Sequence, residues 1–107
     1  MAKSFDRVGL ARALKALAHP SRLAAVEALA KGPRCVCELQ EVMGSDLSTV
    51  SLHLKTLADA GLLDSERRGQ KIFYRLKTPC IGDFLACIDS VLAGEPCRLL
   101  VAAASDR

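Results

Sequence analysis

The sequence has 107 residues, of which half are hydrophobic and a quarter are charged, and its net charge is +3. This length allows one domain of ordinary size, and the hydrophobic share excludes an intrinsically disordered chain. No apolar run reaches the roughly 18 residues that a membrane span needs, and residues 1–7 lack the apolar segment of a secretory signal. These features predict a soluble protein of the cytoplasm.

Apolar residues at helical spacing predict four helices in the first 60 residues. Pro20 suits the first position of the second helix, and Gly32-Pro33 forces a break after it. Asp46 is a favourable N-cap for the fourth helix, which Gly61 closes. The predicted helices span residues 5–17, 20–31, 37–43 and 47–60.

An alternating pattern follows and predicts a hairpin of two strands, over residues 63–67 and 71–76. A fifth helix is expected over residues 80–93. This order of elements predicts a mostly α (α+β) fold, a winged helix-turn-helix with five helices and a two-stranded β-hairpin wing. The predicted domain covers residues 1–93, and residues 94–107 are expected to form a flexible C-terminal tail.

The fourth helix, the second of the helix-turn-helix pair, has a polar face. Short hydroxyl side chains near a helix N-terminus can reach DNA phosphates or base edges, and the terminus itself favours phosphate. His53 has two interpretations, a DNA contact or a packing histidine. The candidate DNA-binding residues on this helix are Ser48, Thr49, Ser51, Leu52, His53 and Lys55.

The hairpin carries the positive charge of the chain. Residues 64–77 hold five basic residues against two acidic ones, so this segment alone has the net charge of the whole protein. A basic turn suits a wing that lies along the DNA backbone, although an ordinary solvated hairpin is the alternative. The candidate DNA-binding residues here are Arg67, Arg68, Gln70 and Lys71.

The first and fifth helices carry more apolar surface than a small helical core can absorb. A winged helix of this size usually needs a second copy to read two half-sites of double-stranded DNA. We therefore expect a homodimer, formed through these two helices, on a palindromic operator.

Several segments together resemble the ArsR/SmtB family of bacterial metal-responsive repressors, over about residues 8–92. The resemblance implies a homodimeric repressor that leaves its operator when an inducer binds. Two positions depart from the pattern: Leu47 stands where many members have Gln, and His19 where many have Asp. The matching segments are residues 17–23 (LAHPSRL), 35–39 (CVCEL), 47–57 (LSTVSLHLKTL), 61–63 (GLL) and 69–76 (GQKIFYRL).

Cys35-Val36-Cys37 resembles the Cys-Val-Cys of the branch that senses arsenic, antimony, cadmium and lead, which implies arsenite or a related soft ion as inducer and a role in arsenical resistance. Thiolates select soft metals and metalloids, and nearby Lys31 and Arg34 are expected to lower the thiol pKa values. Residues two apart on a helix point about 200° apart. Binding one ion should therefore require non-helical backbone at the start of the third helix, and this altered start should tilt the DNA-contacting face.

The third thiolate ligand is open. In one type of arsenite-sensing relative it follows three residues after the second cysteine, where this chain has Gln40. We favour Cys97, in the tail, where it could reach another protomer. Cys80 and Cys87 continue an apolar stripe and are expected to pack. The family's zinc site on the fifth helix is not expected.

Other functions compete with the metalloid-induced repressor. The first alternative is a repressor of the same fold whose cysteines form a redox or persulfide switch. An enzyme with a thiol nucleophile needs a positioned base, which neither His19 nor His53 is placed to supply, so no enzymatic activity and no catalytic cofactor are expected. The last alternative is a module that mainly binds other proteins.

Overall fold

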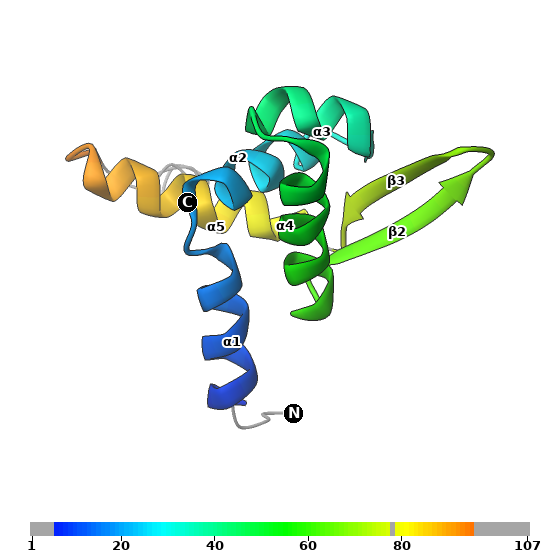
Figure 1. Ribbon diagram of the computed structural model, residues 1–107. Coiled ribbons are helices and arrows are strands. Elements are labelled where there is room, and N and C mark those ends of the chain that lie inside the picture. Colours follow the sequence, from blue (N-terminus) through cyan, green and yellow to red (C-terminus); the bar gives the residue numbers. More distant parts are fainter. Residues whose placement is uncertain (1–5, 78, 96–107) are drawn as a thin grey trace. The chain divides into compact units, whose positions relative to one another are not determined.

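The computed structural model describes residues 6–77 and 79–95. The chain divides into two compact units, Met1–Lys77 and Thr78–Arg107. Within the described residues, no helix is long and apolar enough to cross a membrane. In the part of the chain that the structure describes, the first unit contains four helices and three strands, in an arrangement shown in Figure 1.

Two capped helices begin the first unit. α1 (Arg7–Leu17) starts at Asp6, whose carboxylate accepts a hydrogen bond from the Gly9 N–H at 3.0 Å. α2 (Pro20–Leu29) has Pro at its first position and His19 as N-cap, with the imidazole Nδ1 accepting from the Ser21 N–H at 3.1 Å. His19 therefore caps the start of α2.

The helix-turn-helix consists of α3 (Val36–Met43) and α4 (Leu47–Asp59). Gly44 ends α3 in the left-handed conformation, at φ 65°, which glycine adopts without a steric penalty. Asp46 is the N-cap of α4, as predicted. The two helices pack on α2, and the largest fully buried side chains come from these three helices: Val26, Leu39, Val50, Leu54 and Leu57.

The wing is the antiparallel hairpin of β2 (Leu63–Arg68) and β3 (Lys71–Leu76), which projects away from the helices in Figure 1. A further strand, β1 (Arg34–Cys35), pairs with the other edge of β3, so that Cys35 lies opposite Phe73. The predicted hairpin is confirmed, but the sheet has three strands and not two. A strand of two residues has no alternating pattern that the sequence could reveal.

α5 (Cys80–Leu92) belongs to the second unit, and none of its residues is buried in the single chain. Its exposed apolar side chains recur at helical spacing. They include Phe84, Ile88, Val91 and Leu92. The predicted tail lies outside the described residues from residue 96 onward.

Candidate nucleic-acid interface and thiol site

The N-terminal half of α4 presents polar side chains to solvent. Ser48 and Ser51 are exposed and Thr49 is half-buried. The Ser48 and Thr49 hydroxyls donate to the two carboxylate oxygens of Asp46, at 2.9 and 2.6 Å. Both hydrogen bonds lower the pKa of the Asp46 carboxyl group, and the bond from Thr49 has the larger effect. The carboxylate therefore holds both hydroxyls at the helix start, where phosphate-binding N–H groups also lie.

The same face continues along α4 with Leu52 and Lys55. Leu52 is 63% exposed, and Lys55 is exposed and pairs with Asp59 one turn later at 3.1 Å. An exposed pair of this kind contributes little to folding stability, so Lys55 can exchange it for a phosphate.

His53 lies in the interior and not on the exposed face, which corrects the expectation that it contacts DNA. Only 9% of its surface is exposed. Its Nδ1 accepts a hydrogen bond from the Arg22 Nε at 3.1 Å, and its ring lies 4.5 Å from that of His19. Burial, then the neighbouring His19 and Arg22, lower the pKa of His53. The packing role is the one that the structure supports.

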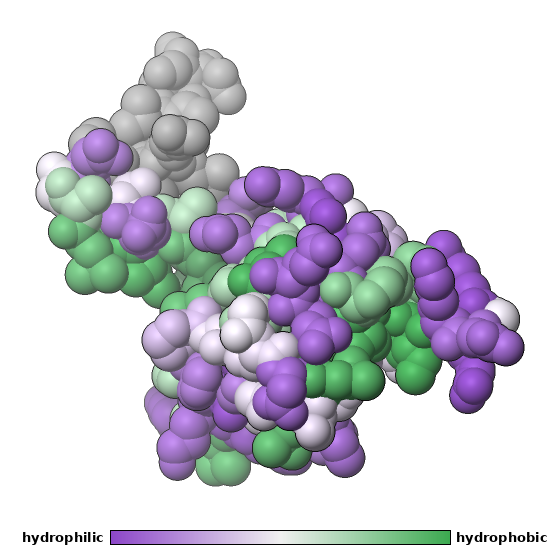
Figure 2. All heavy atoms as spheres, turned by 45° about the horizontal axis from the view of Figure 1, so that its top comes forward, coloured by the Kyte–Doolittle hydropathy of each residue, from purple (hydrophilic) through white to green (hydrophobic). Residues whose placement is uncertain are grey.

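The wing places its basic side chains near the turn. Arg67, Arg68, Gln70 and Lys71 are all exposed. Arg68 is held by Glu66 at 3.1 Å and stacks over the Phe73 ring at 4.6 Å. Figure 2 shows the end of the wing as a hydrophilic projection at the right. These side chains could contact the DNA backbone while α4 lies in a groove.

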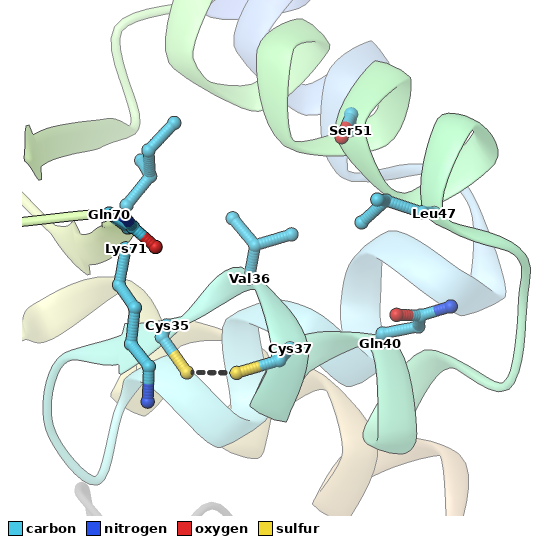
Figure 3. Close-up of a pocket in the computed structure, with 9 residues that line it drawn as sticks. Cys35, Val36, Cys37, Gln40, Leu47, Ser51, Gln70 and Lys71 are labelled. Atoms are coloured by element: carbon cyan, nitrogen blue, oxygen red, sulfur yellow. Dashed lines mark hydrogen bonds between the residues drawn. The ribbon is translucent and has the colours of Figure 1, made fainter.

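The two cysteines of the Cys-Val-Cys segment come together at the start of α3. Cys35 is the N-cap, with extended backbone (φ −80°, ψ 162°), and Cys37 lies in the first turn. Their Sγ atoms point toward one another and are 2.6 Å apart (Figure 3). Cys35 is buried and Cys37 is exposed, so an ion could approach the pair from the side of Cys37.

The non-helical backbone that a shared ion requires is present at Cys35. Cys35 is held there by β1, which pairs it with Phe73, and by its N–H, which donates to Glu38 Oε1 at 3.0 Å. Formation of the site therefore needs no unwinding of α3. The extended backbone expected at the start of the helix is therefore present at Cys35, and the effect of binding on α3 stays a prediction.

The pKa of the Cys35 thiol differs from the expectation. The hydrogen bond with Cys37 raises the pKa of the Cys35 thiol, and this effect outweighs the opposite one from the Glu38 backbone N–H. The expectation that Lys31 and Arg34 lower the pKa of Cys35 is therefore wrong. Glu38 behaves differently, because the Cys35 N–H lowers the pKa of its carboxyl group.

A third ligand does not join the pair within the described residues, which contain no group of three His, Cys, Asp or Glu side chains able to hold a metal ion. Cys80 and Cys87 lie on α5, in the other unit. Cys97, the favoured third ligand, lies outside the described residues.

A pocket of about 370 Å³ adjoins the thiols, which is within the range of roughly 300–1,000 Å³ typical of small-molecule sites. Figure 3 shows the Val36 side chain pointing into the space between α4 and the wing. The pocket joins three elements that sequence reasoning left separate: α3, α4 and the turn region of the wing. Its lining residues are Cys35, Val36, Cys37, Gln40, Leu47, Ser51, Gln70, Lys71 and Ile72.

Sequence reasoning missed the pocket because its walls are far apart in the chain. One signal was visible: Leu47 departs from the family pattern by being apolar. Leu47 is 56% exposed and Ile72 is 41% exposed, so both present apolar surface to the open space.

Residues 19–65 match the family model described as bacterial regulatory protein, arsR family. Over 79 residues the chain is 35% identical to the HTH-type transcriptional regulator YgaV of Escherichia coli, and the match covers 73% of this chain and 80% of YgaV. It is 44% identical over 63 residues to the repressor SmtB of Mycobacterium tuberculosis, covering 59% of this chain and 47% of SmtB. The chain thus spans about half the length of SmtB.

Two further comparisons concern a repressor named for arsenical resistance and a solved structure. The arsenical resistance operon repressor of Staphylococcus xylosus is 37% identical over 67 residues, covering 63% of this chain and 64% of the repressor. A homodimeric winged helix-turn-helix DNA-binding domain from Mycobacterium bovis, a possible ArsR-family regulator, superimposes with a TM-score of 0.72 at 32% identity, covering 87% of this chain and 91% of that domain.

The helix-turn-helix with its basic wing defines a winged helix-turn-helix DNA-binding regulator. The chain belongs to the ArsR family and is a transcriptional repressor of the ArsR/SmtB type. Its relatives are regulators and not enzymes.

Proposed function

We propose that this repressor leaves its operator when trivalent arsenic or antimony binds the thiolates of Cys35 and Cys37. The observation that carries the proposal is the convergence of the two Sγ atoms, 2.6 Å apart, at the start of α3. Two soft sulfur donors at one point favour a soft metalloid over a hard ion, and zinc takes four protein ligands at a structural site, whereas the described residues bring together two. The name of the arsenical repressor of Staphylococcus xylosus supports the same inducer class.

The position of the thiols gives the mechanism. α3 packs on α4 and is joined to it by residues 44–46. Cys35 also pairs with Phe73 of β3. An ion bonded to both sulfurs pushes the two Sγ atoms farther apart than their present 2.6 Å, which shifts the start of α3. This shift displaces α4 and the wing, which carry the proposed DNA contacts.

The DNA contacts in the proposal are those of the exposed residues, with His53 left out. The repressor binds a palindromic operator as a homodimer through α1 and α5, and the homodimeric Mycobacterium bovis domain supports this assembly. Cys97 remains the proposed third thiolate for arsenite. The contacting side chains are Ser48, Thr49, Ser51, Leu52, Lys55, Arg67, Arg68, Gln70 and Lys71.

The test is a titration of the operator-bound protein with arsenite, antimonite, cadmium, lead and zinc, followed by fluorescence anisotropy of labelled DNA. We expect release by arsenite and antimonite, loss of this response in Cys35→Ser and Cys37→Ser, and no release by zinc. Cys80→Ser is the matched control, since it removes a thiol of α5. An unchanged arsenite response in the first two variants would show that the inducer binds elsewhere.

A redox or persulfide switch is the second candidate, and the short distance between the two sulfurs favours it. The raised pKa of Cys35 opposes it, because oxidants react with the thiolate. Mass spectrometry after peroxide or persulfide treatment separates the two functions. The switch requires a disulfide or polysulfide between Cys35 and Cys37 together with loss of operator binding in the absence of any metalloid.

A further inference from the structure

We propose that the pocket beside Cys35 and Cys37 receives the organic group of a trivalent arsenical that carries one carbon substituent. This inference rests on the proposed function and names a ligand class for the same site. Trivalent arsenic forms three bonds. When one of them is to carbon, the two thiols satisfy the remaining valences, and a third thiolate is not needed.

The binding step is an exchange without oxidation or reduction. In the hydrated arsenical, RAs(OH)₂, two As–O bonds break and two As–S bonds form to Cys35 and Cys37. Each thiol proton leaves with a hydroxide as water, and the arsenic remains trivalent. The number of protein donors is the number that the structure brings together in the described part of the chain.

The pocket supplies a place for the substituent. It opens directly beside the thiols and has a volume of about 370 Å³. Its apolar side chains come from all three elements that meet there: Val36 from α3, Leu47 from α4 and Ile72 from β3. Figure 2 shows apolar surface between the helices and the hydrophilic end of the wing. Covering exposed apolar surface with an organic group is favourable.

The other lining residues connect this occupancy to DNA binding. Ser51 of α4 and Gln70 and Lys71 of the wing belong to the proposed DNA interface and also line the pocket. A group seated here lies between the reading helix and the wing and alters their separation. The same group that tightens binding to the protein therefore weakens binding to the operator.

The first test compares phenylarsine oxide with arsenite on the Cys97→Ser variant, measured as competition with dithiothreitol in the absence of DNA. This variant lacks the proposed third thiolate, so the protein and dithiothreitol each offer two sulfurs. Dithiothreitol supplies the preference of a dithiol that has no pocket. Relative to this reference, we expect the protein to prefer the phenyl compound by about tenfold or more, because the ring covers apolar side chains of the pocket. A preference equal to that of dithiothreitol would overturn the inference.

Two matched variants test the pocket itself. Leu47→Gln removes an apolar wall and should lower the preference for the phenyl compound about threefold to tenfold. Leu52→Gln makes the same change on the same helix, at an exposed side chain that does not line the pocket, and should leave the preference unchanged. An equal effect of both variants contradicts the proposal.

The Cys97→Ser variant distinguishes the response to arsenite from the response to phenylarsine oxide. The inference can therefore fail while the proposed function still holds. Operator release by phenylarsine oxide should persist in this variant, whereas release by arsenite should weaken. If arsenite releases the wild-type protein but the phenyl compound shows no pocket-dependent preference, the inference is wrong and the proposed function stands. If neither compound releases the operator, both are wrong.

Discussion

Single residues in this protein serve more than one purpose, and Cys35 is the clearest example. It is the last residue of β1, the N-cap of α3 and one of the two proposed ligands. Caps are usually Ser, Thr, Asp or Asn. A cysteine at this position gives up some capping strength and gains a sulfur atom on non-helical backbone. The chelating geometry is thus produced by the helix boundary itself.

His53 gives a prediction at the same scale. Its pKa is lowered in the folded protein, so the unfolded chain takes up a proton first as the pH falls below about 6.5, the ordinary value. Stability contributed by the neutral ring is fully present above that pH and is lost below it. The groups facing the ring are His19 and Arg22.

We expect His53→Gln to reduce the loss of unfolding free energy between pH 7.5 and pH 5.5 by on the order of 1 kcal/mol. Urea denaturation at the two pH values, followed by circular dichroism, measures this difference. Lys55→Gln, on the same helix but exposed, is the control and should keep the wild-type pH dependence. Equal pH dependence in all three proteins would mean that His53 is not the group that titrates.

At the scale of elements, the wing can be tested through its charge. Each side chain that neutralises a phosphate adds to the salt dependence of binding, because a counterion is released. Arg67→Ala and Lys71→Ala should each make the negative slope of log K against log salt shallower by about 1. Operator binding at several salt concentrations, without inducer, provides the slopes.

Lys77→Ala is the matched control for these two variants. Lys77 lies at the base of the hairpin and is 3.9 Å from Asp64, so its removal should leave the slope unchanged. If the slope became equally shallow in all three variants, the effect would come from charge in general and not from contact by the turn of the wing.

The elements also explain how far the sequence leads. Helices with local signals, such as Pro20 at a first turn and Asp46 at an N-cap, were predicted within two residues of their ends. β1 was missed because two residues form a strand only by pairing with β3, which is 36 or more positions away. His53 was misplaced for a similar reason, since its partner Arg22 is 31 residues earlier. Long-range contacts decided each error.

The whole molecule raises the question of assembly. α5 exposes Phe84, Ile88 and Leu92 in the single chain, and no residue of this helix is buried. Such a patch marks an interface, and two-fold pairing is the commonest way to cover it. The sequence predicts this interface from the apolar surface of the first and fifth helices, and a measurement of the oligomeric state tests it.

We expect Ile88→Glu to convert a dimer into a monomer and to weaken operator binding at least tenfold, because a buried unpaired carboxylate is costly. Sedimentation velocity at micromolar concentration gives the oligomeric state. Ala86→Glu adds the same charge at an exposed position about 200° away on the helix and should remain dimeric. A dimer that survives Ile88→Glu would place the interface away from α5.

The pairing of Cys35 with Phe73 has a consequence for how the signal is transmitted. Cys35 connects the proposed thiol site to two elements, the sheet that leads to the wing and α3, which packs on α4. A movement of Cys35 therefore displaces both the sheet and α3. We therefore expect the repressor to release the DNA contacts of α4 and of the wing in one step. Intermediate inducer concentrations should then give a mixture of bound and free protein and not a weakly bound complex.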